Sequence, residues 1–231
     1  MRRPAGSCVR APKLAALAAA LGAAAGCTNL FHSDAKPEQT YLLRAPSAGA
    51  DGAAAAATAA QPATLLGSLQ VEHPITAPGL DGAHIMLVQA DHRMNFYLGS
   101  RWPAPLPDVV EALAVDTLRA SGEWQTVQGS GSPFFADYLL QISVRRFEAD
   151  YTQGRSAPQV EVVLDCTLGA RRGHELVGTF VASGSAAAAG DRMNEVIAAF
   201  EAASSAALSS LSAQAAGSTR AFAARGATSA H

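Results

Sequence analysis

One stretch of the chain begins with the residue types of a zinc-dependent protease. His174-Glu175-Leu176-Val177-Gly178 starts like the H-E-x-x-H motif, in which two histidines one helical turn apart bind zinc and the glutamate acts as general base. Gly178 stands where the second histidine is required, and the segment has the alternation of a strand. The sequence therefore does not support zinc-protease chemistry at this position.

Other catalytic and cofactor patterns are also missing from the sequence. Ser130 and Ser132 lie in a glycine- and proline-containing turn, but no G-x-S-x-G elbow occurs. There is no G-x-x-x-x-G-K-[ST] phosphate loop and no C-x-x-C pair. The six histidines are dispersed without a metal-binding spacing: His32, His73, His84, His92, His174 and His231. We therefore expect a non-catalytic protein that holds neither a cofactor nor a metal.

Cys27 is the residue whose surroundings predict a chemical modification. Four basic residues precede an uncharged run from Leu14, which at 1.5 Å per residue is too short for a bilayer core of about 30 Å. This order is typical of a secretory signal peptide. The run ends in Ala24-Ala25-Gly26-Cys27, which resembles the bacterial lipobox, although Ala24 replaces the usual leucine. In that motif the cysteine is acylated and becomes the first residue. The alternative is an A-x-A cleavage site, with Cys27 a plain thiol.

The residue after Cys27 and the net charge indicate the compartment and the class of partner. Thr28 stands where an inner-membrane retention signal commonly has aspartate, so we expect a lipid anchor in the outer membrane with the domain facing the periplasm. Loss of the four basic leader residues leaves 13 basic against 19 acidic residues, a net charge of −6. This acidic balance disfavours nucleic acid as a partner.

Cys166 is predicted to be a core residue rather than a nucleophile. It lies in an alternating segment in which Val160, Val162, Leu164 and Leu168 share its face. An unpaired buried cysteine behaves as a small hydrophobic residue.

The periodicity of the chain predicts seven strands and two helices. Strand patterns cover residues 65–71, 84–89, 95–98, 123–128, 138–147, 160–168 and 175–182. One helix covers residues 108–120, with Pro107 in its first turn and Gly122 at its C-terminal end. The second follows Asp191 and has an apolar stripe from Met193 to Leu211. We predict a single layered α/β domain, whose mixed or largely antiparallel sheet carries these two helices.

The predicted domain organisation has four parts. Residues 1–26 are a lipoprotein signal peptide, and residues 27–63 are a tether that contains a low-complexity Ala/Gly segment. Within the tether, Tyr41-Leu42-Leu43 is an isolated apolar patch that could add a strand. Residues 64–213 are the folded domain, and the small, polar residues 214–231 predict a disordered tail.

Two aromatic clusters are the candidate contacts for a partner or a lipid. Tyr97, Arg101 and Trp102 lie just ahead of the first helix, where prolines at 103, 105 and 107 stiffen the backbone. Trp102 could instead pack against that helix and fix its entry. Phe134 and Phe135 follow Pro133 in a turn and form the second cluster.

The order of these features resembles the ABC-type transport auxiliary lipoprotein family, the paraquat-inducible protein C-like lipoproteins. The resemblance covers most of the chain after Cys27. It is carried by Tyr41-Leu42-Leu43, Tyr97, Arg101-Trp102, Pro105-Leu106, Tyr138-Leu139-Leu140-Gln141-Ile142, Arg146-Phe147-Glu148 and the amphipathic helix after Gly190.

This resemblance implies a non-enzymatic role in lipid transport across the envelope. The implied partners are a mammalian-cell-entry (MCE) domain protein and, through it, an inner-membrane ABC permease and ATPase, with phospholipid as a candidate ligand. Two other functions remain open: a structural or assembly lipoprotein of a secretion or surface-polymer machine, and an envelope hydrolase. The hydrolase would need a nucleophile and a base that the sequence does not reveal.

Overall fold

The computed structural model describes residues 38–45 and 65–228, which lie within one compact unit. The predicted signal peptide, Cys27 and most of the predicted tether lie outside the described residues. The sequence placed residues 38–45 in the tether, but this was wrong. They belong to the folded domain, because β1 (Gln39–Thr40) pairs in parallel with the end of β5 (Met94–Arg101). Tyr41-Leu42-Leu43 do not themselves form a strand, and the added strand is β1, which ends immediately before this patch.

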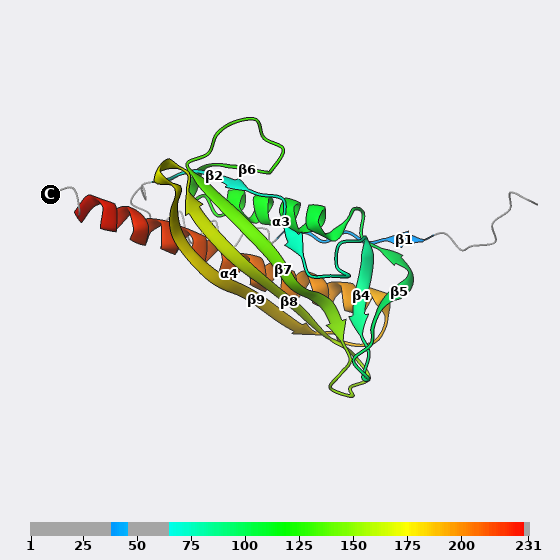
Figure 1. The fold of residues 1–231 in the computed structure, drawn as a ribbon. Helices are drawn as coiled ribbons and strands as arrows, with labels where there is room; N and C mark the ends of the chain where they lie inside the picture. The colour runs from blue at the N-terminus through cyan, green and yellow to red at the C-terminus, as the bar shows by residue number, and fades with distance from the viewer. Residues whose placement is uncertain (1–37, 46–64, 229–231) are drawn as a thin grey trace, which may run out of the picture. The chain divides into compact units, whose positions relative to one another are not determined.

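The sheet is organised around β7 (Tyr138–Asp150) (Figure 1). Along one edge it pairs in parallel with three strands in succession: β2 (Leu66–Val71), β3 (Ile75–Thr76) and β4 (His84–Val88). Along the other edge it pairs antiparallel with β8 (Gln159–Ala170), which pairs antiparallel with β9 (Glu175–Ala187). These last three strands therefore form an antiparallel meander.

The remaining strands extend the sheet beyond β2 and β4. Strand β6 (Trp124–Gln128) pairs in parallel with β2, and β5 pairs antiparallel with β4. A short 3-10 turn, η2 (Arg172–His174), joins β8 to β9. Within residues 38–45 and 65–228 the result is a mixed sheet with two helices, so the predicted single-domain α/β class is confirmed.

Both helices lie on the same face of the sheet, behind it in the view of Figure 1. Helix α3 (Leu106–Ala120) begins two residues before the predicted start, and Pro107 lies in its first turn. Beyond its last residue, Gly122 has a φ of 66°, as its predicted capping role requires. The apolar stripe of α3 is buried, with Val110, Leu113 and Leu118 in the core.

Helix α4 (Met193–Thr228) is longer than the sequence predicted, and the predicted disordered tail from residue 214 was wrong. Beyond Ala213 the helix still buries Ala215, Ala216 and Thr219. These side chains are small, so a hydrophobic pattern does not reveal them, but they allow the helix to lie close to the sheet. By length and composition α4 could span a membrane, but half of its most apolar segment is buried inside the domain, as expected for a core helix.

Candidate functional site: two exposed apolar surfaces

Trp102 lies in the core and not on a contact surface. Its side chain is 1% exposed, and its ring makes edge-to-face contacts with Phe147 and Phe200, with centroid distances of 5.9 and 5.3 Å. Its backbone N–H donates to the carbonyl oxygen of Ala83 at 2.8 Å. The predicted partner contact was therefore wrong for this residue, and the packing alternative is confirmed. A large aromatic ring here joins the start of α3 to β7 and α4.

Tyr97 and Arg101 are also engaged within the domain. The guanidinium of Arg101 pairs with Glu38 at 3.3 Å, beside the short ladder between β1 and β5. The hydroxyl of Tyr97 lies 2.8 Å from that of Tyr151, which in turn donates to Asp191 ahead of α4. Burial raises the pKa of Tyr97 to about 12, so this residue stays protonated and tethers β5 to the end of β7.

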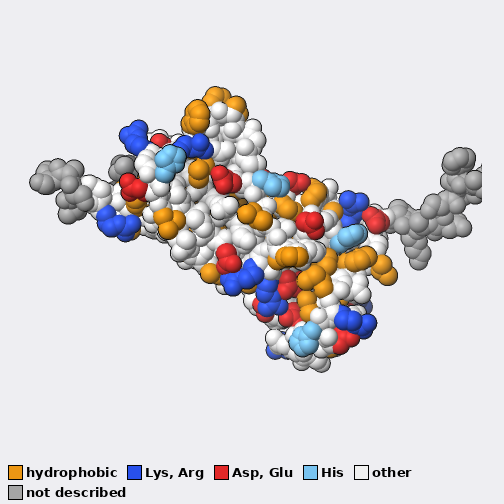
Figure 2. All heavy atoms as spheres, in the orientation of Figure 1, with side chains coloured by type: hydrophobic (Ala, Val, Ile, Leu, Met, Phe, Trp, Pro, Cys, Tyr) orange, Lys and Arg blue, Asp and Glu red, His pale blue; other side chains and the backbone are white. Residues whose placement is uncertain are grey.

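Phe134 and Phe135 are exposed as the sequence predicted, with 74% and 85% of their surface open to solvent. They belong to the loop between β6 and β7, residues 129–137, which we call the Phe loop. This loop projects beyond the sheet in Figure 1, and apolar side chains cover its tip in Figure 2. The Arg171 guanidinium carbon lies 5.4 Å from the centroid of the Phe135 ring, in a cation–π contact.

Side-chain hydrogen bonds hold the Phe loop in this conformation. Gln128 donates through Nε2 to the carbonyl oxygen of Phe134 at 2.8 Å, and it accepts from Ser132 at 2.7 Å. At the end of the loop, the carboxylate of Asp137 accepts from the hydroxyl and the backbone N–H of Ser68 at 2.7 and 2.9 Å. These hydrogen bonds lower the pKa of Asp137 below its ordinary value, so the carboxylate is ionised at neutral pH.

A second apolar surface runs along β5, formed by residues that alternate with Tyr97 and that the sequence did not single out as contacts. Met94, Phe96 and Leu98 alternate along the strand and are all exposed, Leu98 at 85%. We call these three residues the β5 stripe. The Phe96 ring stacks on that of His84 in β4 at 4.4 Å. Figure 2 shows apolar side chains gathered over β4 and β5, on the sheet face that the helices leave uncovered.

The β5 stripe could not be recognised from the sequence alone. Alternating apolar residues predict one buried face of a strand, and the polar residues between them are then expected on the surface. Here the apolar side chains face solvent, whereas Tyr97 between them is half-buried. A tertiary arrangement decides which face of an edge strand meets the core.

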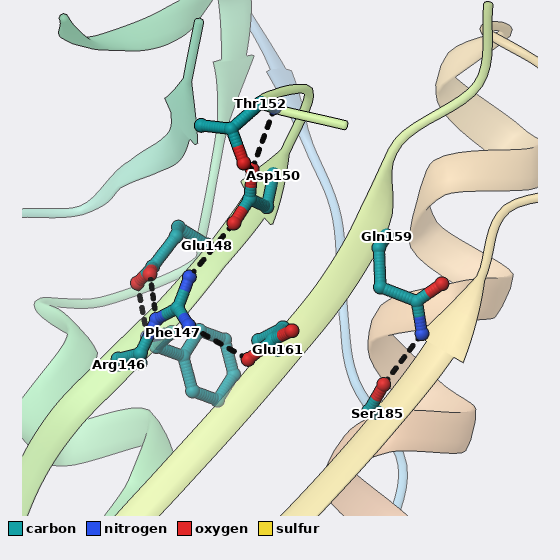
Figure 3. Close-up of polar contacts among 8 residues, drawn as sticks. All are labelled: Arg146, Phe147, Glu148, Asp150, Thr152, Gln159, Glu161 and Ser185. Carbon is teal, nitrogen blue, oxygen red and sulfur yellow. Dashed lines mark hydrogen bonds and ion pairs between the residues drawn. The ribbon is translucent and has the colours of Figure 1, made fainter. Parts of the chain in front are cut away.

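A cluster of charges lies on the same uncovered face (Figure 3). Arg146 uses all three of its nitrogens: it donates to Glu148 at 2.6 Å, to Asp150 at 2.9 Å and to Glu161 at 2.8 Å. Glu148, only 4% exposed, also accepts from the backbone N–H of Phe147 at 2.7 Å. Burial alone would raise the pKa of Asp150, but hydrogen bonds from Thr152 and Arg146 outweigh it and lower that pKa. One guanidinium therefore pairs with three carboxylates, and the cluster as a whole carries a net negative charge.

The residues that could have carried catalysis do not assemble into a metal site. His174 and Glu175 are exposed, in η2 and at the start of β9. No group of three or more candidate ligands comes together within residues 38–45 and 65–228.

His73 lies 3.1 Å from Glu111, whose other carboxylate oxygen accepts a hydrogen bond from the backbone N–H of Ser130 at 2.7 Å. This contact anchors the start of the Phe loop to α3.

The fold and these surfaces define a class of protein: a layered α/β domain whose sheet carries helices on one face and exposes apolar surfaces elsewhere. The sequence places the protein in a family within this class. The chain belongs to the ABC-type transport auxiliary lipoprotein component family, which it matches over residues 50–216. The resemblance noted from the sequence is thereby confirmed. No curated protein matches the chain significantly.

Solved structures share the fold. A crystal structure of a Xanthomonas campestris protein superposes with a TM-score of 0.66 at 23% identity, covering 82% of this chain and 99% of the other. A second crystal structure, of an uncharacterised protein, gives a TM-score of 0.57 at 14% identity, with coverage of 78% and 99%. At these identities the likeness shows the architecture and not the activity.

Proposed function

We propose that this protein is an outer-membrane-anchored periplasmic lipoprotein, a non-catalytic accessory component of an ABC/MCE-type intermembrane lipid transport system. On this proposal it docks the conduit to the outer membrane and receives phospholipid or another hydrophobic cargo from it. The observation that carries the proposal is the family match over residues 50–216. The lipobox-like sequence before Cys27 supports the anchor, because two or more acyl chains hold a protein stably on a membrane.

Within this function, we assign the β5 stripe to the docking of the MCE-domain protein. The stripe lies on an open, helix-free sheet face, and alternate residues of a strand lie about 6.8 Å apart, so its three side chains offer a row of anchors. The Arg146 cluster on the same face supplies a polar, net acidic border. An apolar centre with a polar margin is the composition of a protein interface.

The energy for transport comes, on this proposal, from a different chain. The sequence has no phosphate-binding loop, so ATP hydrolysis is assigned to the ATPase of the system, which acts through its inner-membrane permease. This division of labour agrees with the auxiliary role of the family.

The test is a mild-detergent pull-down of the tagged full-length protein from its own envelope, with protein and lipid mass spectrometry of the eluate. We expect an MCE-domain protein and phospholipid to be recovered. Leu98→Ser should lower recovery of the MCE protein several-fold by removing the most exposed anchor of the β5 stripe. Phe135→Ser is the matched control, since Phe135 is as exposed as Leu98 but lies in the Phe loop.

Other eluates would contradict the proposal. Recovery of secretion or polymer-assembly proteins alone would favour the structural or assembly role. Recovery of an MCE protein that Leu98→Ser leaves unchanged would retain the function and reject the β5 stripe as its docking surface.

A further inference from the structure

We propose that the Phe loop, together with the arginines at its base, is a second membrane contact, through which the folded domain rests on the phospholipid bilayer. This contact is separate from the acyl anchor at Cys27. It takes from the proposed function only the location of the protein at a membrane, and it requires no conduit.

The apolar part of the contact is the pair of phenylalanines at the loop tip. Phe134 and Phe135 are adjacent in the chain and expose most of their surface, and neither ring packs against the hydrophobic core. Exposed aromatic side chains gathered at one point mark an interaction surface. Phenylalanine rings are among the groups that enter the boundary between headgroups and acyl chains.

The polar part lies directly below the tip. Arg171 stacks on Phe135 and donates through Nη2 to Gln70 at 3.0 Å. Its Nε is buried and has no hydrogen-bond partner among the described residues, so the contact with phosphate falls to its outer nitrogens. Arg172 is exposed beside it. Cationic groups next to inserted aromatic rings match the layer of lipid phosphates that borders the acyl region.

A shallow hollow of about 360 Å³ adjoins these residues at the ends of β7, β8 and β9. Leu139 and Leu176 supply its apolar walls, and Arg171 and His174 supply its nitrogen donors, with Glu175 as the acidic group. Leu176 is itself largely exposed. The hollow therefore places apolar surface beside nitrogen donors that can bind phosphate. This combination complements a phospholipid, whose phosphate headgroup adjoins the start of its acyl chains.

The shape and rigidity of the loop favour a bilayer over a protein. The tip is convex and projects from the domain (Figures 1 and 2), whereas a stable protein interface needs about 800 Å² on each partner. A bilayer accepts a small convex tip. The hydrogen bonds of Gln128 and Asp137 already fix the loop, so contact with the membrane costs little ordering.

The experiment uses the mature full chain with Cys27→Ser, which removes the site of acylation, and vesicles of phosphatidylethanolamine and phosphatidylglycerol. Flotation should show binding of this chain. The double change Phe134→Ser and Phe135→Ser should weaken it by about tenfold or more, because two exposed rings are lost. Leu98→Ser, equally exposed on another surface, should not. Arg172→Gln should weaken binding at low salt and less at high salt.

A fluorescence measurement provides a second readout. Both native tryptophans, Trp102 and Trp124, are buried, so Phe135→Trp introduces an exposed reporter. The emission of this variant should shift to shorter wavelength when vesicles are added. Unfolding in urea should confirm that each variant is as stable as its parent chain.

The proposal is overturned if the parent chain does not bind vesicles, if the double variant binds as well as its parent, or if the emission of the Phe135→Trp variant does not shift. The proposal is also overturned if the double change at Phe134 and Phe135 removes a protein partner from the pull-down but leaves vesicle binding unchanged. That result would assign the Phe loop to the protein partner. Because the vesicle assay contains no other protein, its result is independent of the MCE proposal.

Discussion

Gly184 of β9 lies directly against the backbone of α4, and a Cβ atom placed on it would lie 2.7 Å from the backbone nitrogen of Ala207. No side chain can yield at this point, because the neighbouring atoms belong to the helix backbone itself. The glycine therefore sets how closely α4 approaches the sheet.

Gly184→Ala should destabilise the domain by about 1–3 kcal/mol, since the added methyl group must push α4 away from β9. Urea unfolding measures this loss. Gly131→Ala is the control, because a Cβ there would meet nothing within 4 Å. Equal stability of the two variants would show that α4 can shift at no cost.

Trp102→Ala should destabilise the domain by about 3–5 kcal/mol, because it empties a site enclosed by Phe147 and Phe200. Thermal or urea unfolding measures this effect. Leu98→Ala, on the surface, should change the free energy of unfolding by no more than about 0.5 kcal/mol. A Trp102→Ala variant of normal stability that lost a partner would return Trp102 to the contact surface.

The sequence was sufficient for the elements whose burial follows a regular period. The pattern of β8 placed Val160, Val162, Leu164 and Cys166 on one face, and the structure buries them all. It could not give the order of strands along β7, because parallel pairs such as Leu69 with Tyr138 join residues far apart in the chain.

The candidate contacts show the same limit. Both Trp102 and Phe135 are aromatic residues close to prolines, yet one is the centre of the core and the other is largely exposed. Local sequence fixes the stiffness of these segments but not which side meets the sheet. Similarly, alanine and serine in the last turns of α4 carry no amphipathic signal, although Ala215 is fully buried.

Ser68→Ala should destabilise the domain by about 1 kcal/mol at neutral pH, because it removes the hydrogen bonds between the Ser68 hydroxyl and Asp137. The effect is small because Asp137 is exposed, so solvent screens the interaction of its ionised carboxylate. Because folding lowers the pKa of Asp137, this contribution is present above the unfolded pKa of about 3.9 and is lost as the pH falls through the folded value. Urea unfolding at pH 7 and pH 3 should show the difference between parent and variant shrinking in acid. A difference that grew at pH 3 would contradict this role of the carboxylate.

Thiol titration should distinguish the two interpretations of Cys27, because the only other cysteine after the predicted cleavage site, Cys166, is buried and unreactive. Burial raises the pKa of the Cys166 thiol to about 12, so almost no thiolate is present at neutral pH. If Cys27 is acylated, protein purified from membranes should show no reactive thiol when folded and one thiol, that of Cys166, when unfolded in denaturant. A Cys166→Ser variant should show no thiol in either state if Cys27 is acylated. One thiol that reacts rapidly in the folded variant would instead show that Cys27 is free, and would remove the lipid anchor from the proposed function.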